Sequence, residues 1–267
     1  MHSQAHDTTS TKSSALFQLE RRERIMELVL RESRVDVAEL ATAFDVTTET
    51  IRRDLTDLQR DRLVRRVHGG AVPWRSWIFE PKLEVRGGQN VEEKRRIARA
   101  ALSEVPERGS ILIDSGSTTS HFADLLGDRE LTVITNSIPI VQSLATTEAT
   151  DVMVIGGTLR RNTMAFVDEV GVGMLGNITV DVLFMGCDGA SPERGFTTPY
   201  RSEVAIKQAM MSSARRVVMM FDHSKVGNDQ LLRFAAIEDV DVIVTGVETD
   251  IPTTALLEEH GPSVTRV

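Results

Sequence analysis

Cysteine is almost missing from this sequence, since Cys187 is the one cysteine among 267 residues. A single cysteine excludes an intramolecular disulfide framework and favours a reducing compartment. Long apolar runs are missing too, because none approaches the roughly 18 residues that a membrane span needs. The first residues, Met1 to Asp7, are polar and lack the apolar core of a secretion signal. We therefore expect a cytoplasmic protein with no membrane segment.

A net positive charge, which favours a nucleic-acid partner, is also missing. The chain carries 31 basic and 39 acidic residues, a net charge of −8. Residues 47–75, however, hold seven Arg against four acidic residues, whereas residues 76–267 hold 18 basic and 27 acidic residues. A compact basic patch on an otherwise acidic chain can bind DNA locally. A chance cluster of charge on a surface helix is the alternative.

The length of the chain predicts two domains, one small and one medium. Residues 1–15 are rich in Ser, Thr and His and have no periodicity, which is typical of a disordered tail. We expect a DNA-binding domain over residues 16–73, a linker that contains Pro81, Gly87 and Gly88 over residues 74–90, and a second domain over residues 91–267. His2 and His6 lie near no Cys or acidic cluster, so no metal site is expected there.

Three helical segments open the first domain. Residues 19–30 and 37–44 place apolar residues at helical spacing, and Asp36 is suited to the N-cap of the second helix. After a tight turn, Thr47 can cap a third helix over residues 48–60. The apolar face of this third helix consists of Ile51, Leu55 and Leu58.

The third helix has the character of a recognition helix, with one face turned inward and the other available to the major groove of DNA. Arginine can contact guanine or phosphate, and Thr and Glu can read other base edges. Residues 63–72 alternate apolar and basic residues around two glycines, which predicts a β-wing. A solvated charged helix is the alternative, but the capped helices, the basic helix and the basic wing follow one another in one order. The residues predicted to bind DNA are Thr47, Thr48, Glu49, Thr50, Arg52, Arg53, Arg65, Arg66, His68, Gly69 and Gly70.

Short apolar runs alternate with helical stretches from about residue 91 onward. Strands that are apolar on both faces are typical of a mostly parallel, Rossmann-like α/β sheet covered by helices. The order of the strands does not follow from this pattern. The expected strands cover residues 111–114, 131–135, 152–157, 182–186, 217–222 and 240–246, and the expected helices cover residues 92–102, 118–126, 138–145 and 202–214.

Residues 114–119 form a turn of small and hydroxyl residues between a strand and a helix. The N–H groups at the start of such a helix can bind an anion, although simple helix capping is the alternative. Lys225 can supply a positive charge to a phosphate, and Asp114 or Asp188 can accept hydrogen bonds from sugar hydroxyls. Several polar strand ends together predict a small-molecule pocket. Its expected residues are Asp114, Ser115, Gly116, Ser117, Thr118, Thr119, Asn136, Gly156, Gly157, Asp188, Gly189 and Lys225.

Other chemically active residues have simpler interpretations. Cys187 follows a buried strand and is expected to be a packed side chain rather than a nucleophile. Glu203 and Lys207 are four residues apart, which favours an ion pair on a surface helix over an acid and base pair. His121 could contact a ligand, but we favour no such contact. No catalytic residue, metal or cofactor is expected. The methionines expected to fill the core are Met210, Met211, Met219 and Met220.

A set of short segments spread over about residues 19–246 carries one further signal. They are Ala38-Glu39-Leu40-Ala41, Val46-Thr47, Thr50 to Leu55, Arg66 to Ala71, Glu93 to Ala98, Asp114 to Thr119, Thr135-Asn136-Ser137, Gly156-Gly157 and Asp222 to Lys225. These segments resemble the DeoR-type winged helix-turn-helix repressors of bacterial sugar metabolism. The resemblance implies an effector domain similar to ribose-5-phosphate isomerase that binds a phosphorylated sugar or polyol.

The resemblance also assigns roles to residues. Thr50 to Leu55 would be the recognition helix, Arg66 to Ala71 the wing, and Ser115 to Thr119 the phosphate site. Asp188-Gly189-Ala190 is similar to a segment of the isomerases, but Ser191 stands where they have an acidic residue. We therefore expect a regulator, not an enzyme: a homodimeric or homotetrameric repressor of a carbohydrate-utilisation operon that binds double-stranded operator DNA. An isomerase-like enzyme with an accessory DNA-binding domain and an activator are the alternatives.

Overall fold

The computed structural model describes residues 18, 20–29, 32, 34–61, 63–67, 69–73 and 83–267. The chain divides into two compact units, Met1–Phe79 and Glu80–Val267. The expected disordered tail, residues 1–15, lies outside the described residues, as does most of the expected linker. No helix in the described part of the chain has the length and apolar character that a bilayer crossing requires.

The N-terminal unit is a winged helix-turn-helix. Residues 20–29 are helical, and two further helices and a small antiparallel sheet of order β1-β3-β2 follow. Asp36 caps the second helix by accepting a hydrogen bond from the Ala38 N–H, and Thr47 caps the third by accepting one from the Thr50 N–H, which confirms both predicted caps. The elements are β1 (Val35–Asp36), α2 (Val37–Ala43), α3 (Thr48–Arg60), β2 (Val64–Val67) and β3 (Gly70–Pro73).

One apolar cluster holds this unit together. Ile51, Leu55 and Leu58 are buried in it, as the spacing on the third helix predicted. The two glycines where the chain turns from β2 into β3, Gly69 and Gly70, have separate structural roles. Gly69 has a φ of +79°, and a Cβ on Gly70 would lie 1.9 Å from the carbonyl oxygen of Val35. Glycine at position 70 therefore lets β3 approach β1 closely.

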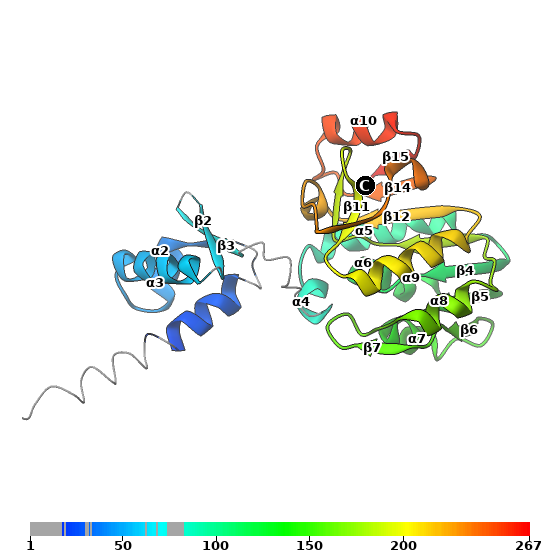
Figure 1. Ribbon diagram of the computed structural model, residues 1–267, viewed down its shortest axis with the longest axis horizontal. Coiled ribbons are helices and arrows are strands. Elements are labelled where there is room, and N and C mark those ends of the chain that lie inside the picture. Colours follow the sequence, from blue (N-terminus) through cyan, green and yellow to red (C-terminus); the bar gives the residue numbers. More distant parts are fainter. Residues whose placement is uncertain are drawn as a thin grey trace, which may run out of the picture. The chain divides into compact units, whose positions relative to one another are not determined.

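The C-terminal unit is built on a seven-stranded sheet of order β15-β14-β12-β9-β4-β5-β6 (Figure 1). Every neighbouring pair in it is parallel. The apolar runs predicted six of these strands within a few residues, and β15 was not predicted. The strands are β4 (Gly109–Ile113), β5 (Leu131–Thr135), β6 (Asp151–Val154), β9 (Val182–Met185), β12 (Val217–Phe221), β14 (Val242–Thr245) and β15 (Ser263–Arg266).

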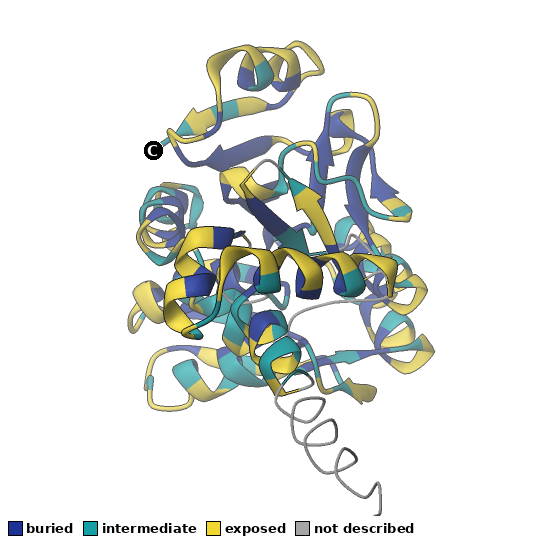
Figure 2. Cartoon of the chain, turned by 90° about the vertical axis from the view of Figure 1, so that its left-hand side faces the viewer, coloured by how far each residue is buried: buried dark blue, intermediate teal, exposed yellow. Residues whose placement is uncertain are grey.

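Alternate residues of each central strand face two different apolar clusters. Ile111 and Ile113 pack on one face with α5, α6 and α7, whereas Leu112 packs on the other with α8, α9 and α10. Figure 2 shows the central strands mostly buried and the outward turns of the helices exposed. The helices are α5 (Val91–Ala101), α6 (Ser117–Leu126), α7 (Ile138–Leu144), α8 (Glu169–Leu175), α9 (Arg201–Ser212) and α10 (Ile251–Glu259).

Shorter elements lie around the main sheet, and none of them was predicted. They form a three-stranded antiparallel sheet of order β10-β11-β13, a hairpin of β7 and β8, and a short α-helix. That helix, α4, lies inside the segment expected to be a linker, so the end of the segment is part of the C-terminal unit. The bounds are α4 (Leu83–Gly87), β7 (Thr158–Arg160), β8 (Ala165–Val167), β10 (Gly189–Ser191), β11 (Gly195–Thr198) and β13 (Leu232–Ala235).

The strand order places β4 between β5 and β9. The chain runs outward from β4 to β5 and β6, then returns to the other side of β4 for β9 and β12. Such a reversal leaves a crevice beyond the carboxyl ends of the two strands, and open α/β sheets bind ligands there. The segments that follow β4 and β9 are therefore brought together.

Candidate functional site

The outward face of α3 carries the side chains that the sequence assigned to DNA. Thr48, Glu49, Arg52 and Arg53 are all exposed. Arg52 forms an ion pair with Glu49 at 3.5 Å, but both side chains are largely in solvent, with 52% and 83% exposed. Such a pair contributes little stability, so the guanidinium can exchange this partner for a phosphate or a base.

The inward face of α3 carries a buried carboxylate that the sequence did not reveal. Asp54 is 1% exposed, and its two oxygens pair with Arg21 Nε at 2.6 Å and Arg22 Nε at 3.1 Å. Both arginines belong to the helical residues 20–29. Asp54 thus fixes α3 to the first helix and does not face outward as the neighbouring arginines do.

The wing is held against α3 by Arg66. Its backbone N–H donates to Gln59 Oε1 at 3.0 Å, and its guanidinium donates to Thr56 Oγ1 at 3.0 Å. The side chains of Arg65 and Arg66 are exposed, whereas Gly70 is buried and its identity is explained by packing. His68, which was predicted to contact DNA, lies outside the described residues.

The C-terminal unit contains a pocket at the crevice between β4 and β9. Nine of the twelve residues that the sequence assigned to effector binding line it, from four different segments. Those nine are Asp114, Ser115, Gly116, Ser117, Thr118, Thr119, Asn136, Asp188 and Lys225. The sequence missed several other lining residues, of which Arg86, Thr163, Cys187, Glu203 and Lys207 are polar or ionisable.

The other three predicted residues, all glycines, do not line this pocket. Gly157 has a φ of +140°, and a Cβ on it would lie 2.7 Å from Asp168. A Cβ on Gly189 would lie 2.0 Å from the carbonyl oxygen of Asn228. The backbone at Gly157 and Gly189 therefore requires glycine, and Gly156, next to Gly157 in the chain, does not line the pocket either.

The start of α6 forms one wall of the pocket. No side chain caps this helix, so its first N–H groups stay available. Thr119, one of the expected pocket residues, uses its hydroxyl within the chain, because this group donates to the carbonyl oxygen of Gly116 at 3.0 Å. On another wall, Thr163 Oγ1 is buried without a hydrogen-bond partner. Unpaired N–H groups and a buried unpaired hydroxyl are suited to a polar ligand.

A network of buried charges forms the floor of the pocket. Lys207 Nζ pairs with Asp114 and also donates to the carbonyl oxygen of Gly186 at 2.9 Å. Glu203 pairs with Arg160 and accepts from Thr198 Oγ1 at 2.7 Å. The prediction that Glu203 and Lys207 form a surface ion pair is therefore wrong. Both are buried, and each is paired with another residue.

The pKa values in this network follow from burial and from the neighbouring charges. Burial and the nearby Asp188 raise the pKa of Glu203. Burial alone would lower the pKa of Lys207. The carboxylates of Asp114 and Glu203 outweigh the effect of burial, so the pKa of Lys207 is raised. Burial likewise opposes the ionised form of Asp188, yet Arg86, Lys225 and Lys207 hold its pKa below the usual value.

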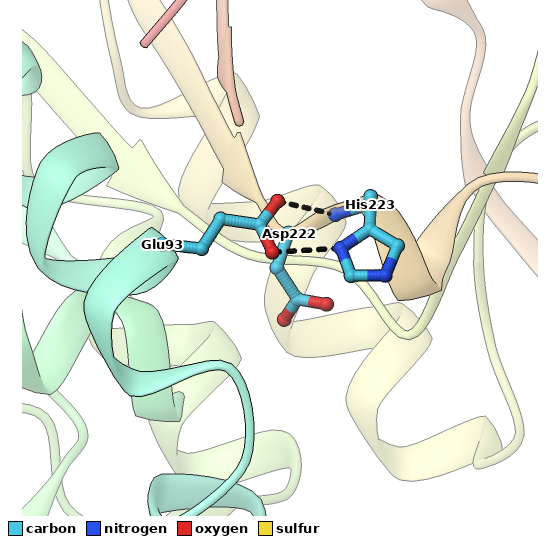
Figure 3. Close-up of side chains that lie close together, drawn as sticks. All are labelled: Glu93, Asp222 and His223. Atoms are coloured by element: carbon cyan, nitrogen blue, oxygen red, sulfur yellow. Dashed lines mark hydrogen bonds and ion pairs between the residues drawn. The ribbon is translucent and has the colours of Figure 1, made fainter. Parts of the chain in front are cut away.

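Lys225 enters the pocket from a short 3-10 helix, His223–Lys225, that follows β12. Hydrogen bonds from this turn reach α5. Both oxygens of Glu93 accept from His223, one from its N–H at 2.8 Å and one paired with Nδ1 at 2.7 Å (Figure 3). Asp222 accepts from Asn90 Nδ2 at 2.9 Å. These contacts fix the turn that carries Lys225.

Glu93, Asp222 and His223 are also close enough to hold a metal ion in principle. A positive charge is already present, however, because Lys94 Nζ lies 3.6 Å from Asp222 Oδ2. Both oxygens of Glu93 are engaged by His223 (Figure 3). The cluster therefore has a structural role, in which Glu93 of α5 holds the turn after β12, and we assign no metal to it.

The remaining residues with simpler interpretations lie largely as expected. Cys187 is buried beside the pocket, and burial raises the pKa of its thiol to about 12, so the reactive thiolate is suppressed. His121 does not line the pocket, and its Nε2 is buried without a hydrogen-bond partner. Met210, Met219 and Met220 are in the core, and Met211 is partly buried against it.

Both units match known protein families. Residues 21–76 match the family described as the DeoR-like helix-turn-helix domain. Residues 89–247 match the family described as the DeoR C terminal sensor domain. The helix α3 and its exposed arginines lie within the helix-turn-helix match. The residues that line the pocket, apart from Arg86, lie within the sensor-domain match.

Curated relatives resemble the chain over nearly its whole length. The "HTH-type transcriptional regulator GlpR" of Haloferax volcanii is 35% identical over 92% of this chain and 96% of its own length. The "Glycerol-3-phosphate regulon repressor" of Escherichia coli is 30% identical over 91% and 96%. Among solved structures, ribose 5-phosphate isomerase A of Methanocaldococcus jannaschii covers 52% of this chain and 55% of its own, with 18% identity and a TM-score of 0.39.

Proposed function

Because the chain belongs to the DeoR family of transcriptional regulators, we propose that it represses an operon for the use of a sugar or polyol. In this proposal, a phosphorylated form of that compound binds the pocket and lowers the affinity for the operator. The protein is a regulator and not an enzyme, which removes the isomerase alternative. The supporting observation is the pocket itself, in which an uncapped helix start faces a lysine and several hydroxyls.

The chemistry of the pocket favours a phosphorylated, hydroxyl-rich ligand. The N–H groups at the start of α6 and the ammonium of Lys225 suit a phosphate. Lys225 forms no ion pair within the part of the chain that the structure describes, whereas Lys207 is neutralised by Asp114. Asn136, Asp114 and Asp188 can bind sugar or polyol hydroxyls. The name of one relative, a glycerol-3-phosphate regulon repressor, agrees with this ligand class.

The test has two steps. Thermal shift and calorimetry with glycerol 3-phosphate, fructose 1-phosphate, ribose 5-phosphate and their unphosphorylated counterparts should show binding of a phosphorylated member only. That compound should then release the wild-type protein from its operator in a gel-shift titration, whereas Lys225→Glu should stay bound. Arg233→Glu, a charge reversal on the exposed side of β13, is the matched control. Equal binding of phosphorylated and unphosphorylated compounds would refute the phosphate assignment.

We also propose that the protein binds its operator as a homodimer or homotetramer. One winged unit offers few phosphate contacts, so specific binding needs at least two copies on half-sites separated by whole helical turns. Sedimentation equilibrium of the full chain should give an even-numbered assembly. Insertion of half a helical turn between the operator half-sites should sharply weaken binding. Tight binding to a single half-site would count against this proposal.

A further inference from the structure

A short helix joins the pocket to the start of the C-terminal unit. Arg86 of α4 reaches into the pocket and pairs with Asp188, with Nη2 to Oδ1 at 3.0 Å. The two side chains are 13% and 15% exposed, so solvent screens this pair only partly. Arg86 precedes residues 89–247, which match the sensor-domain family. All the other residues that line the pocket lie within that match.

The backbone of α4 is attached to the rest of the unit by few hydrogen bonds. The Leu83 N–H donates to the carbonyl oxygen of Asn162 at 2.7 Å, which anchors the start of the helix. The buried ammonium of Lys94 donates to the carbonyl oxygens of Arg86 at 2.6 Å and Gln89 at 2.7 Å, which anchors its end. With five residues, α4 is too short to be stable without such contacts.

The position of α4 in the chain gives these contacts a further meaning. It is the first described element after residues 74–82, the segment through which the chain reaches the unit that carries α3. Any displacement of α4 therefore acts on the covalent connection between the two units. An element with one side chain in a ligand pocket and its backbone next to this connection is suited to transmit ligand binding.

We propose that Arg86 senses the effector and that α4 transmits the response toward the DNA-binding unit. A ligand hydroxyl that donates to Asp188, or a ligand phosphate that attracts the guanidinium, changes the Arg86–Asp188 pair. The altered pair shifts the position of α4 relative to its anchors at Asn162 and Lys94. This inference rests on the proposed function, because it takes the pocket to be the effector site. Two sites are coupled when one structural element has two states and both sites change the equilibrium between them, and α4 is that element in this proposal.

The first experiment compares Arg86→Gln with Arg86→Lys, and uses Arg99→Gln on the exposed side of α5 as the control. Glycerol 3-phosphate, fructose 1-phosphate and ribose 5-phosphate are the probes. Arg86→Gln should bind the operator like wild type, and calorimetry should still detect the probe that binds wild type. That probe should no longer release Arg86→Gln from DNA, whereas release should be partly restored in Arg86→Lys and unchanged in Arg99→Gln. Wild-type release by Arg86→Gln would overturn the inference.

Tryptophan fluorescence gives an independent readout. Trp74 and Trp77 are the two tryptophans of the chain, and both precede α4 in the sequence. The probe that binds wild type should change their emission, and it should leave the emission of Arg86→Gln unchanged although it binds. An equal change in both proteins would contradict transmission through Arg86. If none of the three probes binds wild type, the proposed function fails for these ligands, and the hydrogen-exchange experiment below still decides the inference.

The second experiment needs no ligand. Hydrogen exchange of the backbone amides of residues 83–88 should be faster in full-length Asp188→Asn than in wild type, because α4 loses its ionic partner in the pocket. Glu203→Gln removes a charge from the same pocket but none from the contacts of α4, so it should leave this exchange unchanged. Wild-type exchange in Asp188→Asn would show that the pair does not hold α4, and the inference would fall.

Discussion

Lys207 and Asp114 form a buried ion pair at the floor of the pocket, with Nζ to Oδ2 at 2.5 Å and exposed fractions of 7% and 1%. The pair joins α9 to the carboxyl end of β4. It also neutralises a lysine that would otherwise attract the phosphate of a ligand. The pair therefore leaves Lys225, on the neighbouring turn, to provide the positive charge.

The Lys207–Asp114 pair should stabilise the C-terminal unit when both partners are present. Lys207→Met leaves the carboxylate of Asp114 buried without its ion-pair partner, which should cost about 3–5 kcal/mol in the free energy of unfolding. Urea denaturation measures this loss. The control is Arg215→Ala, because Arg215 pairs with Asp181 at 3.5 Å on the surface with 72% of its side chain exposed. That change should cost about 1 kcal/mol or less. Similar losses for both variants would contradict the role of burial.

Arg52 and Arg53 should provide affinity for DNA without supporting the fold. Alanine at either position should weaken operator binding by about 1–3 kcal/mol per half-site if a base contact is lost, or reduce the salt dependence if a phosphate contact is lost. Fluorescence anisotropy over a range of salt concentrations separates the two results. Arg99→Ala, on the exposed side of α5, should change neither. Wild-type affinity in both α3 variants would overturn the assignment of α3 as the recognition helix.

Asp54 should support DNA binding indirectly, through the position of α3. Asp54→Ala removes its charged hydrogen bonds with Arg21 and Arg22 and should lower local stability by about 1.5–3 kcal/mol. Native-state hydrogen exchange of the α3 amides reports this loss. Asp61→Ala, at the exposed end of the same helix, is the control and should leave exchange unchanged. A loss of DNA binding in Asp54→Ala without faster exchange would indicate direct contact with DNA.

Lys94 should make stability depend on pH in the alkaline range. Burial lowers its pKa to about 8 in the folded protein, against 10.5 for an ordinary lysine. Between these two values the unfolded chain binds the proton and the folded chain does not, so stability rises with pH. The difference between the two pKa values corresponds to about 3 kcal/mol of stability. This stability is fully present above pH 10.5 and is lost as the pH falls through 8. Urea denaturation across this range should show the rise in wild type and lose this component in Lys94→Met. Identical slopes would contradict the shift.

Local sequence patterns predicted the elements that carry the two sites. The α3 helix could be predicted because Thr47 begins it and its apolar residues repeat at helical spacing. The pocket wall over residues 114–119 could be predicted because a small-residue turn between an apolar run and a helix has few structural alternatives. Both patterns depend on neighbours in the chain, which a sequence displays directly.

Residues brought in from distant segments could not be predicted in the same way. Glu203 and Lys207 were assigned to the surface by their spacing of four residues. Ile206 and Met210 continue the same stripe and are buried, so the pattern of the whole helix could have placed the two charges inside. The place of Arg86 in the pocket could not be predicted from the sequence, because its partner Asp188 is 102 positions away in the chain. The strand order was equally hidden, since parallel strands do not reveal their neighbours in sequence.

The neighbouring positions of β4 and β9 have a consequence for the synthesis of the protein. About 70 residues separate the ends of these strands in the chain, yet the pocket needs both, together with the turn after β12. A ribosome therefore completes α3 and the wing long before the pocket exists. A chain cut short ahead of β9 would carry every described part of the DNA-binding unit but only part of the pocket. Nonsense mutations shortly before β9 should thus leave the described residues of the DNA-binding unit encoded but remove control by a ligand.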